Sequence, residues 1–287
     1  MSKLFTTIGD EHWYPSNSLP DTWYPSVTTI LKAYPKGVGF ERYLANQESY
    51  ESSREILKAA GIRGTNVHDA TERLENGSIL KRSEFTDEEW KMLIGFINFH
   101  KDLAPQVIMT ERSFVSDTLK TGGTIDRIYK IDGEYVILDI KTSKAIYNNY
   151  WLQIATYYHI YMELKDSIGM GDIVPKRTAI LRLAPGKKSG YELVYHDMEE
   201  IIADYEAFQA LYNVWKYDNP KAKPQFDTLP DAIYLGYNID NAKSIININL
   251  NQNYEETTNV GGAQSEENQP PQIDRIKRSK KESKIVA

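Results

Sequence analysis

Residues 122–141 read GGTIDRIYKIDGEYVILDIK and carry the pattern of a β-hairpin. Two largely apolar runs, 124–131 and 135–140, flank the pair Asp132-Gly133. An Asp-Gly pair between apolar runs is the strongest short-range signal for a two-residue type I′ turn. The sequence therefore predicts two antiparallel strands that meet at this turn.

A two-residue turn also fixes which residues of the hairpin oppose each other. Counting outward pairs Asp126 with Asp139 and Thr124 with Lys141. Because side chains alternate along a strand, Asp139 and Lys141 share one face of the sheet, and Ile125 is expected on the other. Directly opposed Cβ atoms lie only about 4.5–5.5 Å apart. The hairpin is thus expected to set two carboxylates and an ammonium side by side.

Opposed carboxylates in an apolar hairpin need a compensating cation, because like charges directly opposite destabilise a strand pair. Lys141 is one such cation, and a divalent metal is another, since hard cations bind carboxylates. A solvated polar face is the alternative. Ile128 and Ile137 are expected on the same face as Asp126 and Asp139, so full exposure of the carboxylates is disfavoured. The spacing favours a metal-binding or catalytic role.

Asp126 followed by Asp139-Ile140-Lys141 resembles the core of the PD-(D/E)XK nuclease superfamily. The resemblance implies that Asp126 and Asp139 bind Mg²⁺ or Mn²⁺, with the Ile140 carbonyl as a further ligand. It implies that Lys141 positions or helps to activate the attacking water. Whether this lysine acts as a base or as a fixed positive charge stays open.

Two further motifs resemble the RecB-like branch of that superfamily. Gly64-x-x-x-His68-x-x-x-Glu72 is similar to a motif whose histidine binds the metal, and Gln153-x-x-x-Tyr157 is similar to the branch's QxxxY motif. The resemblance implies that His68 is a metal ligand and that Gln153 and Tyr157 contact nucleic acid. Taken alone, Tyr157 could equally be a core aromatic with a satisfied hydroxyl.

The segments 25–28 (PSVT) and 139–143 (DIKTS) resemble most the phage exonucleases and the mitochondrial genome maintenance exonuclease. The similarity spans residues 25–215. It implies a metal-dependent exonuclease that hydrolyses DNA, single-stranded or at strand ends, in repair, recombination or phage replication, with replication or recombination proteins as partners. A structure-selective endonuclease and a catalytically idle DNA-binding or assembly subunit are the alternatives.

Both faces of the hairpin are largely apolar, which predicts a central sheet covered by helices. Thr86 and Glu89 form a capping box at the start of one helix, and 148–165 is expected as another. The fold class is therefore α/β (α+β), with a central mixed sheet and an antiparallel hairpin; the resemblance implies a restriction-endonuclease-like core. The stretch 39–76 has a helical pattern, which Gly61 and Gly64 are expected to break or to adapt to close packing.

The chain is expected to divide into three parts: an N-terminal arm or hairpin (1–25), the nuclease domain (26–237) and a tail (238–287). The arm contains Trp-Tyr-Pro-Ser twice, and its aromatic residues are expected to pack on the domain. The tail is rich in Asn and Gln, ends in basic residues and has the composition of a disordered segment. Its basic end is either a phosphate-binding arm or a solubilising terminus.

Composition narrows the function classes. The chain has 287 residues and no cysteine, which excludes disulfides and a cysteine-ligated iron–sulfur cluster. A net charge of −6 argues mildly against tight, non-specific coating of DNA, although a bound metal would supply local positive charge. No 18-residue apolar run and no signal-peptide pattern occur, so no membrane span is expected. The expected location is intracellular, in the cytoplasm of a bacterium or of a phage-infected host cell.

Overall fold

A computed structural model describes residues 6–8, 11–37 and 49–224 of the chain. The tail expected over 238–287 lies outside these described residues, as does the first part of the helical pattern, 38–48. Residues 1–227 form one compact unit, to which the description below refers.

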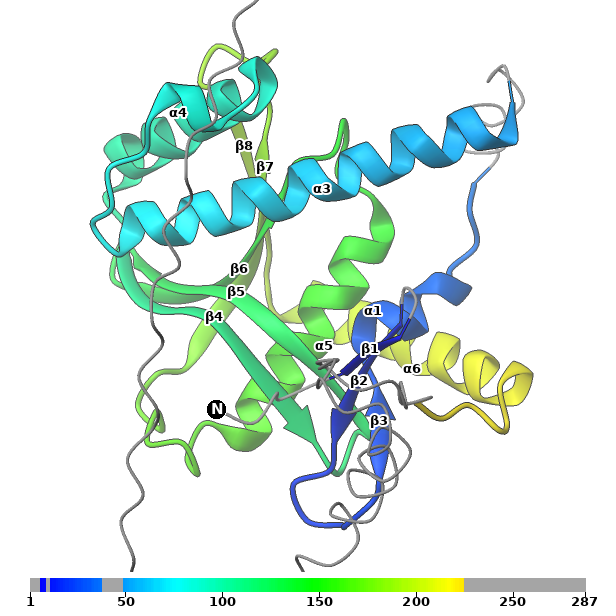
Figure 1. Cartoon of the computed structure of the whole chain (residues 1–287). Coiled ribbons are helices and arrows are strands. Elements are labelled where there is room, and N and C mark those ends of the chain that lie inside the picture. The colour runs from blue at the N-terminus through cyan, green and yellow to red at the C-terminus, as the bar shows by residue number, and fades with distance from the viewer. Residues whose placement is uncertain (1–5, 9–10, 38–48, 225–287) are drawn as a thin grey trace, which may run out of the picture. The chain divides into compact units, whose positions relative to one another are not determined.

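The core of this unit is a five-stranded mixed sheet (Figure 1). Its strands are β4 (Gln106–Ser116), β5 (Thr121–Ile131), β6 (Glu134–Lys141), β7 (Pro175–Leu183) and β8 (Tyr191–His196), in the spatial order β4-β5-β6-β7-β8. Neighbouring strands are antiparallel except β6 and β7, which are parallel. Helix α5 (Asn148–Leu164) makes the connection between these two parallel strands. The predicted mixed sheet with an antiparallel hairpin is confirmed.

The β5–β6 hairpin has the predicted register from the turn to Arg127 and Leu138, but the predicted pairs Asp126–Asp139 and Thr124–Lys141 do not form. Ile131 pairs with Glu134, and the pairing continues to Arg127 and Leu138. Both turn residues have positive φ, 50° at Asp132 and 85° at Gly133, as a type I′ turn requires. The ladder ends one position before the two aspartates, where β6 continues alone alongside β7.

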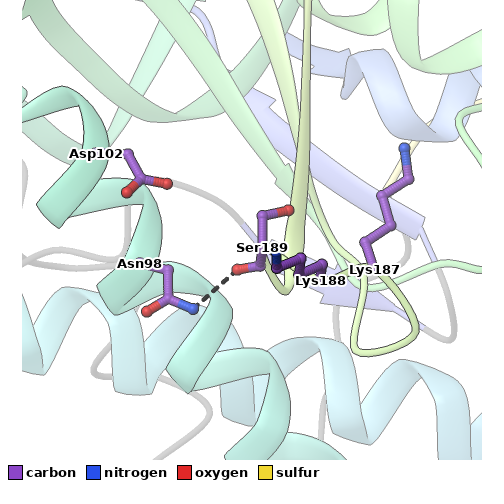
Figure 2. A pocket seen from close by; sticks show the side chains of 5 residues that line it. All are labelled: Asn98, Asp102, Lys187, Lys188 and Ser189. Atoms are coloured by element: carbon purple, nitrogen blue, oxygen red, sulfur yellow. Dashed lines mark hydrogen bonds between the residues drawn. The ribbon is translucent and has the colours of Figure 1, made fainter.

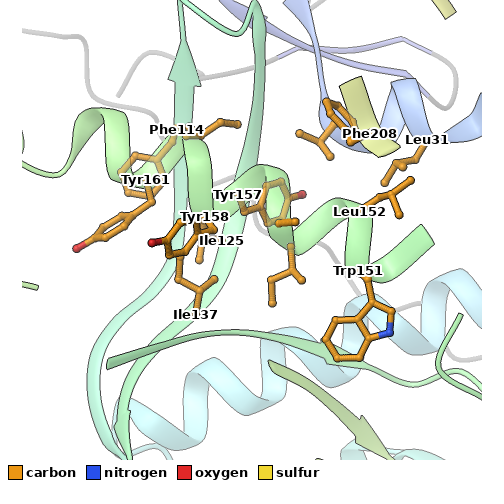
Figure 3. Close-up of a cluster of buried hydrophobic side chains, with 14 of the residues drawn as sticks. Leu31, Phe114, Ile125, Ile137, Trp151, Leu152, Tyr157, Tyr158, Tyr161 and Phe208 are labelled. Atoms are coloured by element: carbon orange, nitrogen blue, oxygen red, sulfur yellow. The ribbon is translucent and has the colours of Figure 1, made fainter. Parts of the chain in front are cut away.

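Helices cover both faces of the sheet (Figure 1). One hydrophobic cluster joins the sheet to α3 (Tyr50–Glu75) and α4 (Asp87–Leu103). The other cluster joins it to α5 and α6 (Met198–Asp218) and is drawn in Figure 3. Ile125 lies in the second cluster beside Ile128 and Ile137, so its expected position on the opposite face is wrong. Glu111 of β4, which stands opposite the neighbouring Asp126, has a φ of 41°.

Helix α3 runs without a break through Gly61 and Gly64, so the expected break does not occur. A Cβ at Gly61 would meet nothing within 4 Å, and one at Gly64 would make only an ordinary 3.6 Å contact with Thr142. Close packing therefore does not require glycine at either position. The capping box of Thr86 and Glu89 at the start of α4 is confirmed.

The N-terminal arm is a three-stranded antiparallel sheet of β1 (Thr6–Ile8), β2 (Glu11–Pro15) and β3 (Trp23–Pro25). Trp13, Tyr14 and Tyr24 are buried, which confirms that the aromatic residues of the arm pack on the domain. Two short helices follow, α1 (Val27–Ile30), capped by Ser26, and the 3-10 helix η1 (Leu31–Ala33). A second 3-10 helix, η2 (Arg82–Glu84), precedes α4.

The loop between β7 and β8 is fastened to α4. Gly95 and Gly190 bring the two backbones so close that a Cβ on Gly95 would lie 2.2 Å from the Gly190 carbonyl oxygen. Next to this contact, the Asn98 side chain donates a 2.9 Å hydrogen bond to the Ser189 carbonyl, as Figure 2 shows. The loop therefore has a fixed position beside the sheet. No helix in the described part of the chain is both long and apolar enough to cross a membrane.

Candidate active site

The two aspartates of the hairpin lie where β5 and β6 separate. Beyond the last ladder pair, the Asp126 carboxylate takes the place of a backbone partner and accepts a 2.8 Å hydrogen bond from the Ile140 amide. Asp126 is 8% exposed and Asp139 is 2% exposed, so both carboxylates are buried. A solvated polar face, the alternative from the sequence, does not describe this site.

His68 reaches the same point from α3. Its Nε2 lies 2.9 Å from the Ile140 carbonyl oxygen, which can only accept, so this nitrogen carries a proton. Its Nδ1 lies 3.4 Å from Asp126 and 3.6 Å from Glu111. Burial alone lowers the pKa of His68, but Asp126, Glu111 and Asp139 outweigh burial and raise it to about 9. The imidazolium thus offsets part of the negative charge gathered here.

Glu111 was not predicted as a member of the site. It lies between Thr110 and Arg112, which pair with Arg127 and Ile125, so it stands opposite Asp126 in the β4–β5 ladder. Ligand atoms of His68, Glu111 and Asp126 all lie within 4.8 Å of one another. We call Glu111, Asp126 and Asp139 the carboxylate cluster.

Asp139 and Lys141 form an ion pair on the predicted shared face. The Lys141 Nζ lies 2.6 Å from Asp139 Oδ2, yet this buried oxygen has no well-aligned hydrogen-bond donor among the described residues. Burial raises the pKa of Asp139 to about 6, with Asp126 adding to the rise and Lys141 opposing it. Burial lowers the pKa of Lys141, but Asp139 and Asp126 raise it more, which leaves the side chain an ammonium.

Gln153 contacts this ion pair from α5, and Tyr157, one helical turn further on, contacts Gln153. The Gln153 amide accepts from Lys141 at 3.1 Å and donates to Asp139 at 3.1 Å. It also donates to the Tyr157 hydroxyl at 3.2 Å. Both side chains are buried, and Tyr157 packs so tightly on Gly123 that a Cβ there would lie 2.2 Å from its ring. In this arrangement they fix Asp139 and Lys141, and direct contact with nucleic acid stays a prediction.

Two aromatic side chains at the start of α5 are more accessible. The ring of Tyr150 lies under the Lys141 ammonium, 4.7 Å from centroid to nitrogen. Tyr147 packs edge-on against Tyr150 and is 49% exposed. By contrast, Trp151 is buried and stacked on His196 with 3.5 Å between ring centroids. Tyr147 and Tyr150 therefore form an aromatic surface next to Lys141 that is more accessible than Trp151.

Directly behind Asp126 lies a second group of buried charges, which the sequence did not reveal. Arg127, 0% exposed, donates to Glu75 at 2.6 Å, to Glu111 at 2.8 Å and to Thr71 at 3.0 Å. Tyr129 donates a hydrogen bond to the other oxygen of Glu75. We call these five side chains the Arg127 network. It ties the end of α3 to the strands that carry the carboxylate cluster.

The donor set fits a hard divalent cation. Carboxylate oxygens and a backbone carbonyl are the groups that Mg²⁺ and Mn²⁺ prefer. The imidazole of His68 is a softer ligand and binds a metal only in its neutral form. Asp139 Oδ2 lacks an aligned donor, and His68 and Lys141 are two cations set against three carboxylates. Of the expected ligands, His68 and Asp126 lie together with Glu111, and both contact Ile140. Asp139 lies outside this group of three, and its contacts are with Lys141 and Gln153.

No protein-family model matches the sequence, and no curated protein is similar to it. Among solved structures, the fold is similar to the crystal structure of a candidate exonuclease from Eubacterium rectale. The match has a TM-score of 0.41 and 14% sequence identity, and it covers 78% of this chain and 92% of the other. At this level of similarity the likeness by itself assigns neither a family nor a function.

Proposed function

We propose that this chain is a metal-dependent deoxyribonuclease that hydrolyses phosphodiester bonds, acting as an exonuclease on single-stranded DNA or strand ends. The observation that supports it best is the meeting of Asp126, Asp139 and Lys141 with His68 at the point where β5 and β6 part. His68 and Lys141, the most distant of these residues in the sequence, are 73 positions apart, and the four come from three separate elements. A structural salt bridge alone does not call for three carboxylates in one buried group.

The carboxylate cluster, His68 and the Ile140 carbonyl would hold the metal ion. A bound divalent ion neutralises phosphate oxygens and lowers the pKa of a coordinated water, which is the chemistry that phosphodiester hydrolysis needs. Removal of the buried negative charge by a cation would also relieve the repulsion that raises the pKa of Asp139.

Lys141 would act as a fixed positive charge. Its ammonium is held by Asp139, Gln153 and the Tyr150 ring, and the carboxylates keep it protonated. A preorganised charge in a buried site stabilises the negative charge that develops on the phosphate in the transition state. Of the two roles left open for this lysine, electrostatic stabilisation has the stronger support.

Gln153 and Tyr157 would act as positioning residues. One amide group of Gln153 accepts from Lys141 and donates to Asp139, so it fixes the orientation of both with a single side chain. Tyr157 in turn receives a hydrogen bond from Gln153 and closes the site against the core. Such support keeps reactive groups in the geometry that catalysis requires.

A single strand suits the surroundings of the site. Helix α3 carries His68 on one side, and α5 carries Gln153 on the other, with Tyr147 and Tyr150 next to Lys141. Stacking of a base on an aromatic ring contributes about 1–3 kcal/mol, whereas opening a duplex costs about 1.4 kcal/mol per step. Roles in repair, recombination or phage replication, with their protein partners, and a cytoplasmic location are part of the same proposal.

The test is a nuclease assay on linear single-stranded DNA, a circle of the same sequence and a duplex, with Mg²⁺ or Mn²⁺. We expect the linear strand to be degraded from an end and the circle to resist. Equal cutting of both would reject the exonuclease and favour an endonuclease. Binding without any cleavage would favour an idle DNA-binding subunit.

A further inference from the structure

A cavity of about 280 Å³ lies beside the candidate active site. Its walls come from α3, α4, the residues that follow β6 and the fixed loop between β7 and β8. Thr142 and Lys144 line it, and they follow Lys141 directly in the sequence. The cavity therefore begins directly after β6, the strand that carries Asp139 and Lys141.

The cavity lies at the line of contact between α3 and β6, which we call the α3–β6 seam, one helical turn from His68. His68 on α3 contacts Ile140 on β6, and four residues earlier on the helix Gly64 faces Thr142, two residues later in the chain. One helical turn rises about 5.4 Å, and two residues of strand rise about 6.6 Å. A nucleotide strand laid along this seam would bring the phosphate next to the scissile one to the cavity.

The lining carries an excess of positive charge. Arg63, Lys144, Arg182 and Lys187 line the cavity, and Glu88 is the only acid among the described lining residues. Outside the cavity, Glu192 offsets part of this charge, because it pairs with Arg182 and Lys187 at 2.6 Å each. In a chain of net charge −6, such a local excess of cations favours an anionic ligand.

Two of these cations retain donors for a ligand. Arg63 reaches Glu88 at 3.0 Å through Nη1, and its Nη2 makes no hydrogen bond with the described residues. The Lys144 ammonium makes no ion pair within the described part of the chain, and its backbone carbonyl accepts from Arg182 at 3.0 Å, which fixes the backbone. Charged N–H groups of this kind form strong hydrogen bonds with phosphate oxygens.

We propose that this cavity is a phosphate subsite, formed by Arg63, Lys144 and the Thr142 hydroxyl, that holds a phosphate of the substrate strand next to the scissile one. The proposal rests on the proposed nuclease function for its ligand. Arg182 and Lys187 act indirectly, because their pairs with Glu192 keep the β7–β8 loop against the cavity. The phosphate is either a terminal monoester or an internal diester, and both present the same oxygens to these donors.

The test uses Arg63→Gln, Lys144→Gln and the double variant, with Lys188→Gln as the matched control. Lys188 lies on the β7–β8 loop next to Lys187, but it does not line this cavity. Binding of a labelled single-stranded oligonucleotide is measured in EDTA at several salt concentrations, so cleavage does not contribute. We expect the double variant to bind about 10-fold more weakly, with the salt slope reduced by roughly 0.7, the contribution of one phosphate contact on a single strand. Lys188→Gln should behave as the wild type.

Inorganic phosphate provides a second readout that needs neither DNA nor catalysis. We expect phosphate to raise the melting temperature of the wild type and of Lys188→Gln above that in chloride of equal ionic strength, and not that of the double variant. Oligonucleotides with phosphate or hydroxyl ends identify the source. If the double variant loses a preference of the wild type for phosphorylated ends, the subsite holds a terminal phosphate. If its affinity for oligonucleotides with either end falls equally, the subsite holds an internal phosphate.

The two proposals fail separately. If the wild type cleaves DNA, but the double variant binds the oligonucleotide and phosphate as well as Lys188→Gln does, the subsite proposal is wrong and the nuclease proposal stands. If the wild type never cleaves DNA, but phosphate stabilises it and not the double variant, the nuclease proposal is wrong and the anion site stands. Because Lys144 is exposed, its single variant keeps the result independent of any folding defect at Arg63.

Discussion

Asp126 and Arg127 are neighbours in β5, yet they belong to two buried charged groups of opposite character. In the Arg127 network, three nitrogens of the guanidinium have acceptors and both oxygens of Glu75 have donors. In the carboxylate cluster, Asp139 lacks an aligned donor at one oxygen, and its pKa is raised to about 6. Among the described residues, the Arg127 network satisfies its own hydrogen bonds, whereas the carboxylate cluster keeps one oxygen without an aligned donor, although the Lys141 ammonium lies 2.6 Å from it.

Under the proposed function, this difference separates a structural role from a functional one. A buried ion network that satisfies its own hydrogen bonds holds the elements in place, whereas an incomplete one is arranged for a ligand that the chain does not supply. Glu111 belongs to both groups, because it accepts from Arg127 at 2.8 Å and faces His68 at 3.6 Å. The complete network therefore positions one carboxylate of the incomplete cluster.

The largest effect is expected from Asp139→Asn. Removal of this carboxylate should reduce the rate of DNA cleavage by roughly 10⁴-fold, the scale seen when one member of a catalytic unit is lost. The fold should persist, because the pKa of Asp139 is raised by burial and the neutral amide removes a buried charge. Asp132→Asn, in the exposed turn of the same hairpin, is the control. Full activity of Asp139→Asn in excess EDTA would rule out this mechanism.

Arg127→Met tests the other half of the comparison. It leaves the buried Glu75 carboxylate and the partly exposed Glu111 carboxylate without the guanidinium, which should lower the free energy of unfolding by about 3–5 kcal/mol. Arg73→Met, which breaks only exposed ion pairs with Asp69 and Glu84, should cost under about 1 kcal/mol. Urea unfolding measures both. Similar small losses in the two variants would show that the network does not hold the site in place.

Lys141→Ala should lower the cleavage rate at least about 100-fold, since it removes one preorganised charge from the transition state. Binding of DNA in EDTA should change little. Lys130→Ala, on the same hairpin and paired with the Tyr135 ring, is the matched control. Equal and large losses of binding and rate would instead identify Lys141 as an anchor for a phosphate.

The part of the site that could be predicted depends on local rules. The Asp132-Gly133 turn fixed the register, and the register brought Asp126, Asp139 and Lys141 together. Turn geometry determines strand pairing without reference to the rest of the chain. His68, Gln153 and Tyr157 entered only through resemblance, because nothing local links two helices to the hairpin.

The residues that were missed depend on contacts distant in sequence. Glu111 stands opposite Asp126 because a four-residue loop, 117–120, joins β4 to β5. This loop contains no glycine, so the sequence gives little sign of a tight turn whose residues could be counted outward. Arg127 is buried only because Glu75, 52 residues earlier, meets it at the end of α3.

The smallest effect is expected from removal of residues 238–287. Few apolar side chains in this tail can pack, so the melting temperature of the remaining chain should not change. If the basic end binds phosphate, truncation should weaken DNA binding and flatten its dependence on salt. A lower melting temperature after truncation would show that the tail docks on the domain and that the boundary is wrong.

The most direct test of the incomplete carboxylate cluster is the effect of Mn²⁺ on the melting temperature and on DNA cleavage, measured on the same wild-type sample. A cation that binds the folded state alone stabilises it by about 2.7 kcal/mol at 100 times its dissociation constant. We expect Mn²⁺ to raise the melting temperature of the wild type and to switch on cleavage, EDTA to reverse both, and Asp126→Asn to lose both. Cleavage that persists in EDTA, with a melting temperature indifferent to Mn²⁺, would contradict the claim that this cluster is completed by a metal.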